Sequence, residues 1–72
     1  MQTLSIDREP VELYKLLKFA SLAASGGEAK WLIGEGQVRV NDAVECRKRR
    51  KIHAGDVIAL GEDTYRVTLT PS

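Results

Sequence analysis

The hydrophobic positions follow a helical period in the first third of the chain. Four apolar residues recur at intervals of three and four: Leu13, Leu16, Leu17 and Ala20. This spacing predicts one buried face of a helix. Pro10 suits the first helical position, because a helix leaves its first N–H groups unpaired anyway. We expect a core helix over residues 10–20, after a short strand at residues 3–6.

A second helix is predicted by a start signal and a stop signal. Ser25 and Glu28 fit the S-x-x-E capping box. In this motif the serine oxygen accepts from the Glu28 N–H, and the glutamate reaches back to the Ser25 N–H. Gly36 stands where a left-handed residue commonly ends a helix. We expect a helix over residues 26–35, with an apolar stripe of Ala29, Leu32 and Ile33.

Beyond residue 36 the hydrophobic period changes to two, which is typical of strands. Val38 and Val40 share one face, and Asn41-Asp42 suits a two-residue turn to a partner strand at residues 43–45. Two more strands are expected at residues 57–60 and 64–69. A strand, two helices and a β-meander predict an α+β fold. The 72 residues should form a single domain, with the helices packed on a small, mainly antiparallel sheet.

Positive charge is concentrated in the middle of the chain. Residues 30–53 carry seven basic and three acidic groups, whereas the net charge of the whole chain is only +1. Five basic residues are consecutive: Arg47, Lys48, Arg49, Arg50 and Lys51. Adjacent cations repel one another unless water or an anion surrounds them. The run is therefore either a solvated loop or, with Lys30 and Arg39, a surface for phosphate groups.

Neither catalysis nor metal binding is indicated. Cys46 and His53 are the only residues of their types, and no orienting acid or ligand spacing accompanies them. We expect Cys46 to be a half-buried filler and His53 a rim residue. No enzyme activity and no cofactor are predicted. One cysteine excludes an internal disulfide, and neither a signal-peptide pattern nor a membrane-length apolar run is present, so a cytoplasmic location without membrane contact is expected.

Two features of the sequence each have two possible interpretations. Ser25-Gly26-Gly27 is either a helix cap alone, which Glu28 favours, or a helix start that offers N–H groups to phosphate. Trp31 falls opposite the apolar stripe of its helix. We expect it to pack under the N-terminal strand or a C-terminal segment. The alternative is an exposed ring beside Lys30, suited to stacking on an unpaired base.

The order of these motifs resembles the RNA-binding domain named after ribosomal protein S-four, with its αL motif. Ten positions carry the resemblance: Ser25, Ala29, Ile33, Gly36, Val38, Val40, Asn41, Gly55, Asp56 and Ile58. It covers about residues 11–60. The segments LLKFASLAASGGEAK and VECRKRRK are most similar to the small stand-alone bacterial members, the YbcJ type.

The resemblance implies non-catalytic binding of structured RNA, chiefly rRNA or tRNA, by the two helices and the following turn. The implied contact residues are Ser25, Gly26, Gly27 and Lys30 at the helix start, together with Arg47, Lys48, Arg49, Arg50 and Lys51. Arg39 joins this candidate set through its charge alone. The chain departs from the family pattern twice, with Gly26 where many members have arginine and Asp42 where glycine is usual. We expect a monomer that binds RNA, with the ribosome as a further candidate partner. The alternative is a ribosome-associated adaptor whose basic run meets an acidic protein.

Overall fold

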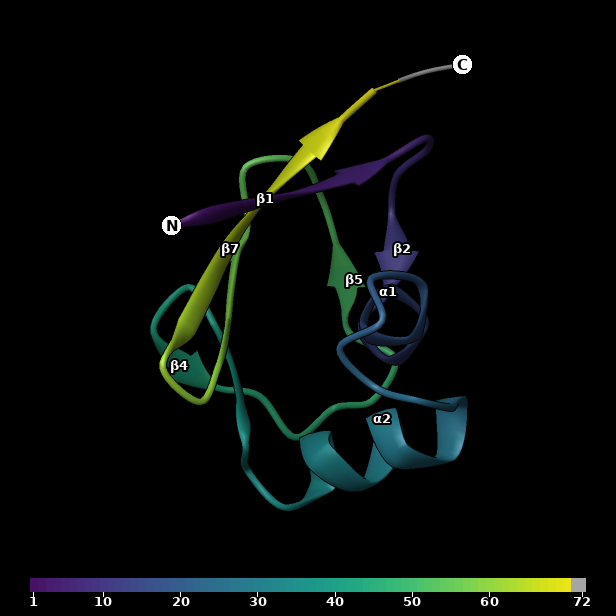
Figure 1. Ribbon diagram of the computed structural model, residues 1–72, viewed down its shortest axis with the longest axis vertical. Coiled ribbons are helices and arrows are strands. Elements are labelled where there is room, and N and C mark those ends of the chain that lie inside the picture. Colours follow the sequence, from purple (N-terminus) through teal and green to yellow (C-terminus); the bar gives the residue numbers. More distant parts are fainter. Residues whose placement is uncertain (71–72) are drawn as a thin grey trace.

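The computed structural model describes residues 1–70. A five-stranded sheet forms one side of the molecule (Figure 1). Across the sheet the order is β1 (Gln2–Ile6), β7 (Asp63–Leu69), β6 (Val57–Leu60), β3 (Val38–Val40) and β4 (Ala43–Val44). β1 runs parallel to β7, and every other neighbouring pair in this sheet is antiparallel. The predicted mainly antiparallel sheet is confirmed.

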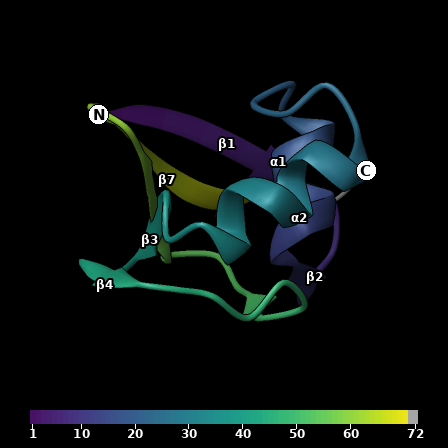
Figure 2. The same ribbon diagram turned by 90° about the horizontal axis from the view of Figure 1, so that it is seen from below.

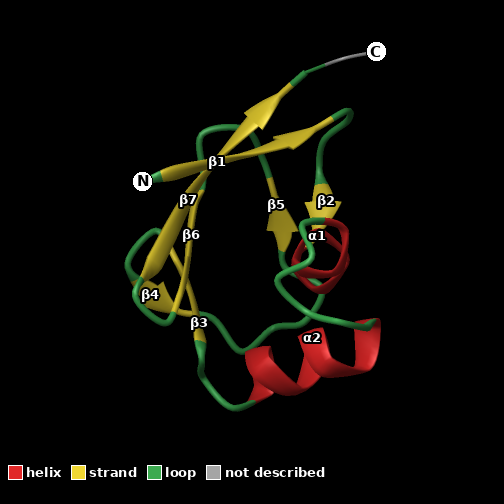
Figure 3. Cartoon of the chain, in the orientation of Figure 1, coloured by secondary structure: helices red, strands yellow, loops and turns green. Residues whose placement is uncertain are grey.

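Two helices lie beside this sheet, and Figures 2 and 3 show both on the same side of it. They are α1 (Leu13–Phe19) and α2 (Gly26–Gly34). A second, two-stranded sheet joins β2 (Val11–Glu12) to β5 (Lys51–Ile52). The Cα radius of gyration is 10.8 Å, close to the ~11 Å of a single compact domain of this length. The α+β class is confirmed.

One core joins the helices to both sheets. Its fully buried side chains come from six elements: Leu13, Leu16, Leu17, Ile33, Val38, Val40, Ile52, Ile58 and Val67. The three leucines are the helical face that the spacing predicted, and the two valines are the inward face of β3. The core therefore fixes α1 and α2 relative to the hairpin of β3 and β4.

The first helix begins three residues later than predicted. Val11 and Glu12 form strand β2, pairing with Ile52 and Lys51 of β5. Their backbone is extended in this pairing, so α1 starts only at Leu13. Pro10 therefore precedes a strand, and the prediction that it opens the helix is wrong.

The second helix has the predicted caps, with one difference. Ser25 Oγ accepts from the Glu28 N–H at 3.1 Å. Glu28 Oε1, however, accepts from the N–H of Ala24 at 3.0 Å and not from that of Ser25. At the other end Gly36 has φ +76, and Gly36 and Gln37 donate back to the carbonyls of Ile33 and Leu32. This is a Schellman ending, which requires the left-handed glycine.

Candidate nucleic-acid interface

The five consecutive cations, residues 47–51, comprise a loop and the first residue of β5 and are bound to the start of α1. We call this segment the basic loop. The N–H of Leu13 donates to the Arg50 carbonyl at 2.9 Å, and the N–H of Tyr14 donates to the Lys48 carbonyl at 3.1 Å. Glu12, the N-cap of α1, makes no side-chain cap bond. The basic loop therefore satisfies donors that the first turn of every helix leaves unpaired, and its backbone is held in place.

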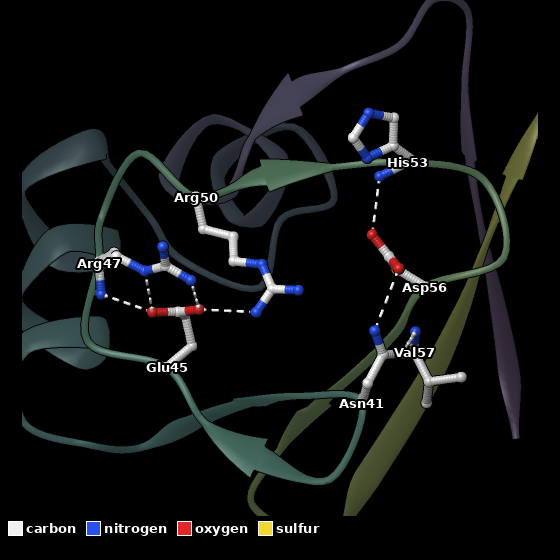
Figure 4. A network of polar contacts seen from close by, with 7 residues as sticks. All are labelled: Asn41, Glu45, Arg47, Arg50, His53, Asp56 and Val57. Carbon is white, nitrogen blue, oxygen red and sulfur yellow. Dashed lines mark hydrogen bonds and ion pairs between the residues drawn. The ribbon is translucent and has the colours of Figure 1, made fainter.

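Glu45 binds two of the five cations (Figure 4). Arg47 donates to its carboxylate from Nε at 3.0 Å and from Nη2 at 3.1 Å, and Arg50 donates from Nη1 at 2.7 Å. The Arg47 backbone N–H adds a further bond at 3.0 Å. Glu45 is only 6% exposed. A buried carboxylate with charged donors on both oxygens is a strong, geometrically specific anchor.

These bonds change the titration of Glu45. The hydrogen bonds from Arg47, and then the one from Arg50, lower its pKa from the ordinary value of 4.5 to about 2, although burial acts in the opposite direction. Glu45 is thus ionised at neutral pH. It neutralises part of the basic loop and offsets the repulsion among the adjacent cations.

The other cations of the basic loop are more accessible to a ligand. The side chain of Arg49 is 73% exposed, and its Nε lies 3.9 Å from a Glu12 oxygen. At that distance, and with Arg49 in solvent, Glu12 holds the guanidinium only weakly. Lys48 and Lys51 are exposed as well. Arg47 is 75% exposed although it contacts Glu45, whereas Arg50 is 28% exposed.

Tyr14 connects the basic loop to the start of α2, and sequence reasoning gave it no role. Its N–H binds the Lys48 carbonyl, and the Lys30 ammonium lies 4.7 Å from its ring centroid. A Cβ placed on Gly26 would lie 3.9 Å from the same ring. At the other end of α2, a Cβ on Gly34 would lie 3.6 Å from Lys48 Cε. The structure thus brings the helix start, Lys30 and the basic loop together.

Arg39 belongs to a different part of the surface. It is exposed on β3 and lines a shallow depression with Gly36, Gln37, Val44 and Gly61. Ser25, by contrast, uses its hydroxyl to cap α2. Arg39 therefore lies on the sheet, whereas Gly26, Lys30 and Lys48 lie around Tyr14.

A second polar network joins the β3–β4 turn to the turn before β6 (Figure 4). Asn41 donates to Asp56 at 3.1 Å and accepts from the Val57 N–H at 2.9 Å, and the His53 N–H donates to Asp56 at 2.8 Å. Burial would raise the pKa of Asp56, but these hydrogen bonds and nearby positive charge lower it overall. His53 is an exposed rim residue, as predicted.

Two side chains differ from the prediction. Trp31 is 60% exposed on α2 and does not pack under a terminal strand. β1 cannot cover it, because β1 pairs along β7 at the edge of the sheet. Cys46 is exposed, not half-buried, since its neighbour Glu45 takes the inward position at that point of the chain.

Two further features are absent from the described part of the chain. Residues 1–70 contain no group of three or more His, Cys, Asp or Glu side chains that could hold a metal ion. Within the same residues, no helix has the length and apolar character needed to cross a membrane.

Two short helices followed by a β-hairpin, on one small α+β domain, form the arrangement that the sequence predicted as an αL motif. The family model for the S4 domain matches residues 4–68. The chain therefore belongs to the S4 domain family, and the family predicted from the sequence motifs is confirmed.

Individual relatives agree with this assignment. Over 68 residues the chain is 46% identical to the Escherichia coli protein named "Putative RNA-binding protein YbcJ", covering 93% of this chain and 97% of that one. It is 44% identical over 57 residues to the Bacillus subtilis "Probable ribosome maturation protein RlbA", covering 79% and 80%. The solution structure of E. coli YbcJ, described as revealing an αL motif involved in RNA-binding, has a TM-score of 0.71 at 45% identity and covers 94% of this chain and 87% of that one.

Proposed function

We propose that this protein is a non-catalytic, cytoplasmic, monomeric RNA-binding protein that recognises structured RNA, rRNA or tRNA, by shape and through the phosphate backbone. One observation carries the proposal: the basic loop is bound by its carbonyls to α1 and by two arginines to Glu45. A solvated loop would not need such anchoring. Cations held in fixed positions lose less conformational freedom when they bind phosphate.

The structure suggests a division of roles within the basic loop. Lys48, Arg49 and Lys51 are exposed and supply phosphate contacts, together with Lys30 on α2. Arg47 binds Glu45 and still exposes most of its guanidinium, so it can bridge to a phosphate. Arg50 is a positioning residue, because its partly covered side chain is committed to Glu45.

The helix start contributes less directly in this proposal. Ser25 caps α2. Gly26 and Gly27 have no side chains, so an RNA backbone can approach the helix closely beside Tyr14 and Lys30. Arg39 adds a phosphate contact only if the RNA extends to the outer edge of the sheet.

Titration of a small panel of rRNA and tRNA fragments at several salt concentrations tests this function. With four or five cations on phosphates, the logarithm of affinity should fall against the logarithm of salt concentration with a slope of about −3 to −4. A flat salt response would contradict the proposal.

An adaptor role on the ribosome is the second candidate, and the name of the B. subtilis relative favours a ribosomal setting. There the basic loop would bind an acidic protein. Charge reversal at the basic loop would abolish both kinds of binding and cannot separate them. Pull-downs with and without nuclease treatment do: partners that survive RNA removal favour the adaptor, and partners that are lost favour RNA binding.

A further inference from the structure

Trp31 is a large apolar side chain that the fold leaves in water. It is 60% exposed, while the buried residues of α2, Ala29 and Ile33, lie on the opposite face. Burial of an aromatic ring is strongly favourable, so the fold itself gains little from tryptophan here. A binding partner is the natural means of covering the ring.

The neighbours of Trp31 on α2 divide into two sides. At ~100° per residue, Gly27, Gly34 and Lys30 lie on one side of Trp31, and Glu28 and Glu35 lie on the other. The two glycines have no side chain, so the helix surface is bare between Trp31 and the cations. Lys48 of the basic loop reaches the same side, with Cε 3.6 Å from the Cβ position of Gly34.

This arrangement suits one kind of ligand. A single-stranded nucleotide has an anionic backbone and a flat base that extends to one side. Its phosphates match Lys30 and Lys48 across the glycines, and its base then lies at the indole ring. The acids on the far side of the ring, Glu28 and Glu35, repel a second backbone there.

We propose that Trp31 stacks on an unpaired base of the bound RNA, so that the preferred target has a loop, bulge or single-stranded end beside its helical part. This inference rests on the proposed function and narrows it. A base inside a duplex already stacks on its neighbours, so only an unpaired one can use the ring.

Trp31 is also the chain's only tryptophan, which makes its fluorescence a direct probe. Two RNAs are compared: a hairpin with a loop of unpaired adenosines and a blunt duplex with the same stem. Stacking should quench the emission on titration with the hairpin, while the duplex leaves it nearly unchanged. Inorganic polyphosphate is the charge control, and quenching by polyphosphate would overturn the proposal.

Affinity is then measured with labelled RNA for Trp31→Ala, Trp31→Phe and a matched control, Phe19→Ala. Phe19 is 79% exposed on α1 and lines a groove beside β1, whose lining includes Lys51 of the basic loop but no residue of α2. Trp31→Ala should weaken hairpin binding about 5- to 150-fold, the range for loss of one stacked base, and leave duplex binding unchanged. Trp31→Phe should restore most of the affinity, and Phe19→Ala should bind like the parent protein.

Failure of the stacking proposal can be distinguished from failure of RNA binding. Equal hairpin binding by the parent protein and Trp31→Ala, without quenching, would overturn the stacking and leave RNA binding intact. Binding of neither RNA would overturn both proposals. An emission shift that depends on protein concentration without RNA would instead place Trp31 at a contact between two copies of the chain, and would overturn the stacking.

Discussion

Arg50 Nη1 donates a 2.7 Å hydrogen bond to Oε1 of Glu45. The same carboxylate binds Arg47 through three further bonds. A single buried acid thus holds both arginines while Lys48 and Arg49, between them in sequence, stay exposed. The relationship explains how five consecutive cations can belong to a folded surface and not to a disordered loop.

Glu45→Gln should destabilise the domain by about 2–3 kcal/mol. The substitution keeps the size of the side chain but removes the charge, so its amide N–H₂ group faces guanidinium donors. Loss of one partner from a buried ion pair costs ~3–5 kcal/mol, and the exposure of Arg47 reduces this figure. Urea unfolding measures the change.

The matched control for that variant is Glu62→Gln, an exposed acid in the turn before β7. It should change stability by less than about 0.5 kcal/mol. Equal effects of the two substitutions would show that the Glu45 contacts contribute nothing specific.

Stability should also depend on the ionisation of Glu45. Its pKa is about 2 in the folded protein and lies near 4.5 ordinarily. The folded state therefore binds protons less readily, and the contribution is complete above about pH 4.5 and is lost as the pH falls toward 2. With ~1.4 kcal/mol per pKa unit it amounts to at most about 3 kcal/mol.

Other carboxylates contribute to acid unfolding, because Glu12 and Asp56 also have lowered pKa values. Parallel unfolding curves for the parent protein and Glu45→Gln at several pH values isolate the contribution of Glu45 to stability. The stability difference between the two should shrink as the pH decreases below 4.5. A difference that stays constant down to pH 2 would mean that the Glu45 pKa is not lowered.

Local patterns predicted most of the backbone. The helical stripes, the Ser25 cap, the Gly36 ending and the Asn41-Asp42 turn each depend on a few neighbouring residues, so their signals are complete within one segment. The start of α1 was mispredicted because it depends on the pairing of β2 with β5, about 40 residues later in the chain.

The candidate site was less predictable for the same reason. The sequence showed a run of cations, and Glu45, two residues before Arg47, was an available signal. It did not show which cations would bind that acid. Tyr14 carries no chemical motif and gains its place from packing between α1, α2 and the basic loop. Periodicity placed Trp31 opposite the apolar stripe of its helix, but it did not show whether another element would cover that face; β1 pairs with β7 instead.

Asp42→Gly should stabilise the hairpin. Asp42 has φ +70 and its neighbour Asn41 has φ +52. The left-handed conformation costs an ordinary L-residue ~1–2 kcal/mol and glycine almost nothing. Because aspartate tolerates this conformation better than most residues, we expect a gain of about 0.5–1 kcal/mol in urea unfolding.

The same substitution removes a negative charge from the turn, which should strengthen RNA binding if the turn lies at the interface. Asp42→Asn separates the two effects, since asparagine removes the charge and still tolerates positive φ. It should raise RNA affinity as Asp42→Gly does but change stability little. A less stable Asp42→Gly protein would refute the backbone argument.

Lys48→Ala should remove one phosphate contact without disturbing the fold. The part of Lys48 that holds the basic loop in place is its carbonyl, which accepts from Tyr14 and remains in alanine. Affinity should therefore fall similarly for every RNA in a panel, and the slope of log affinity against log salt should become shallower by about 1.

Arg66→Ala is the control for that measurement, because Arg66 is an exposed cation on β7, outside the proposed contact set. Its slope should match that of the parent protein. If the two variants lose the same amount, the dependence on salt reflects overall charge and not a defined surface. An unchanged slope for Lys48→Ala would show that Lys48 does not contact phosphate. The phosphate contacts of the basic loop would then come from Arg47, Arg49 and Lys51.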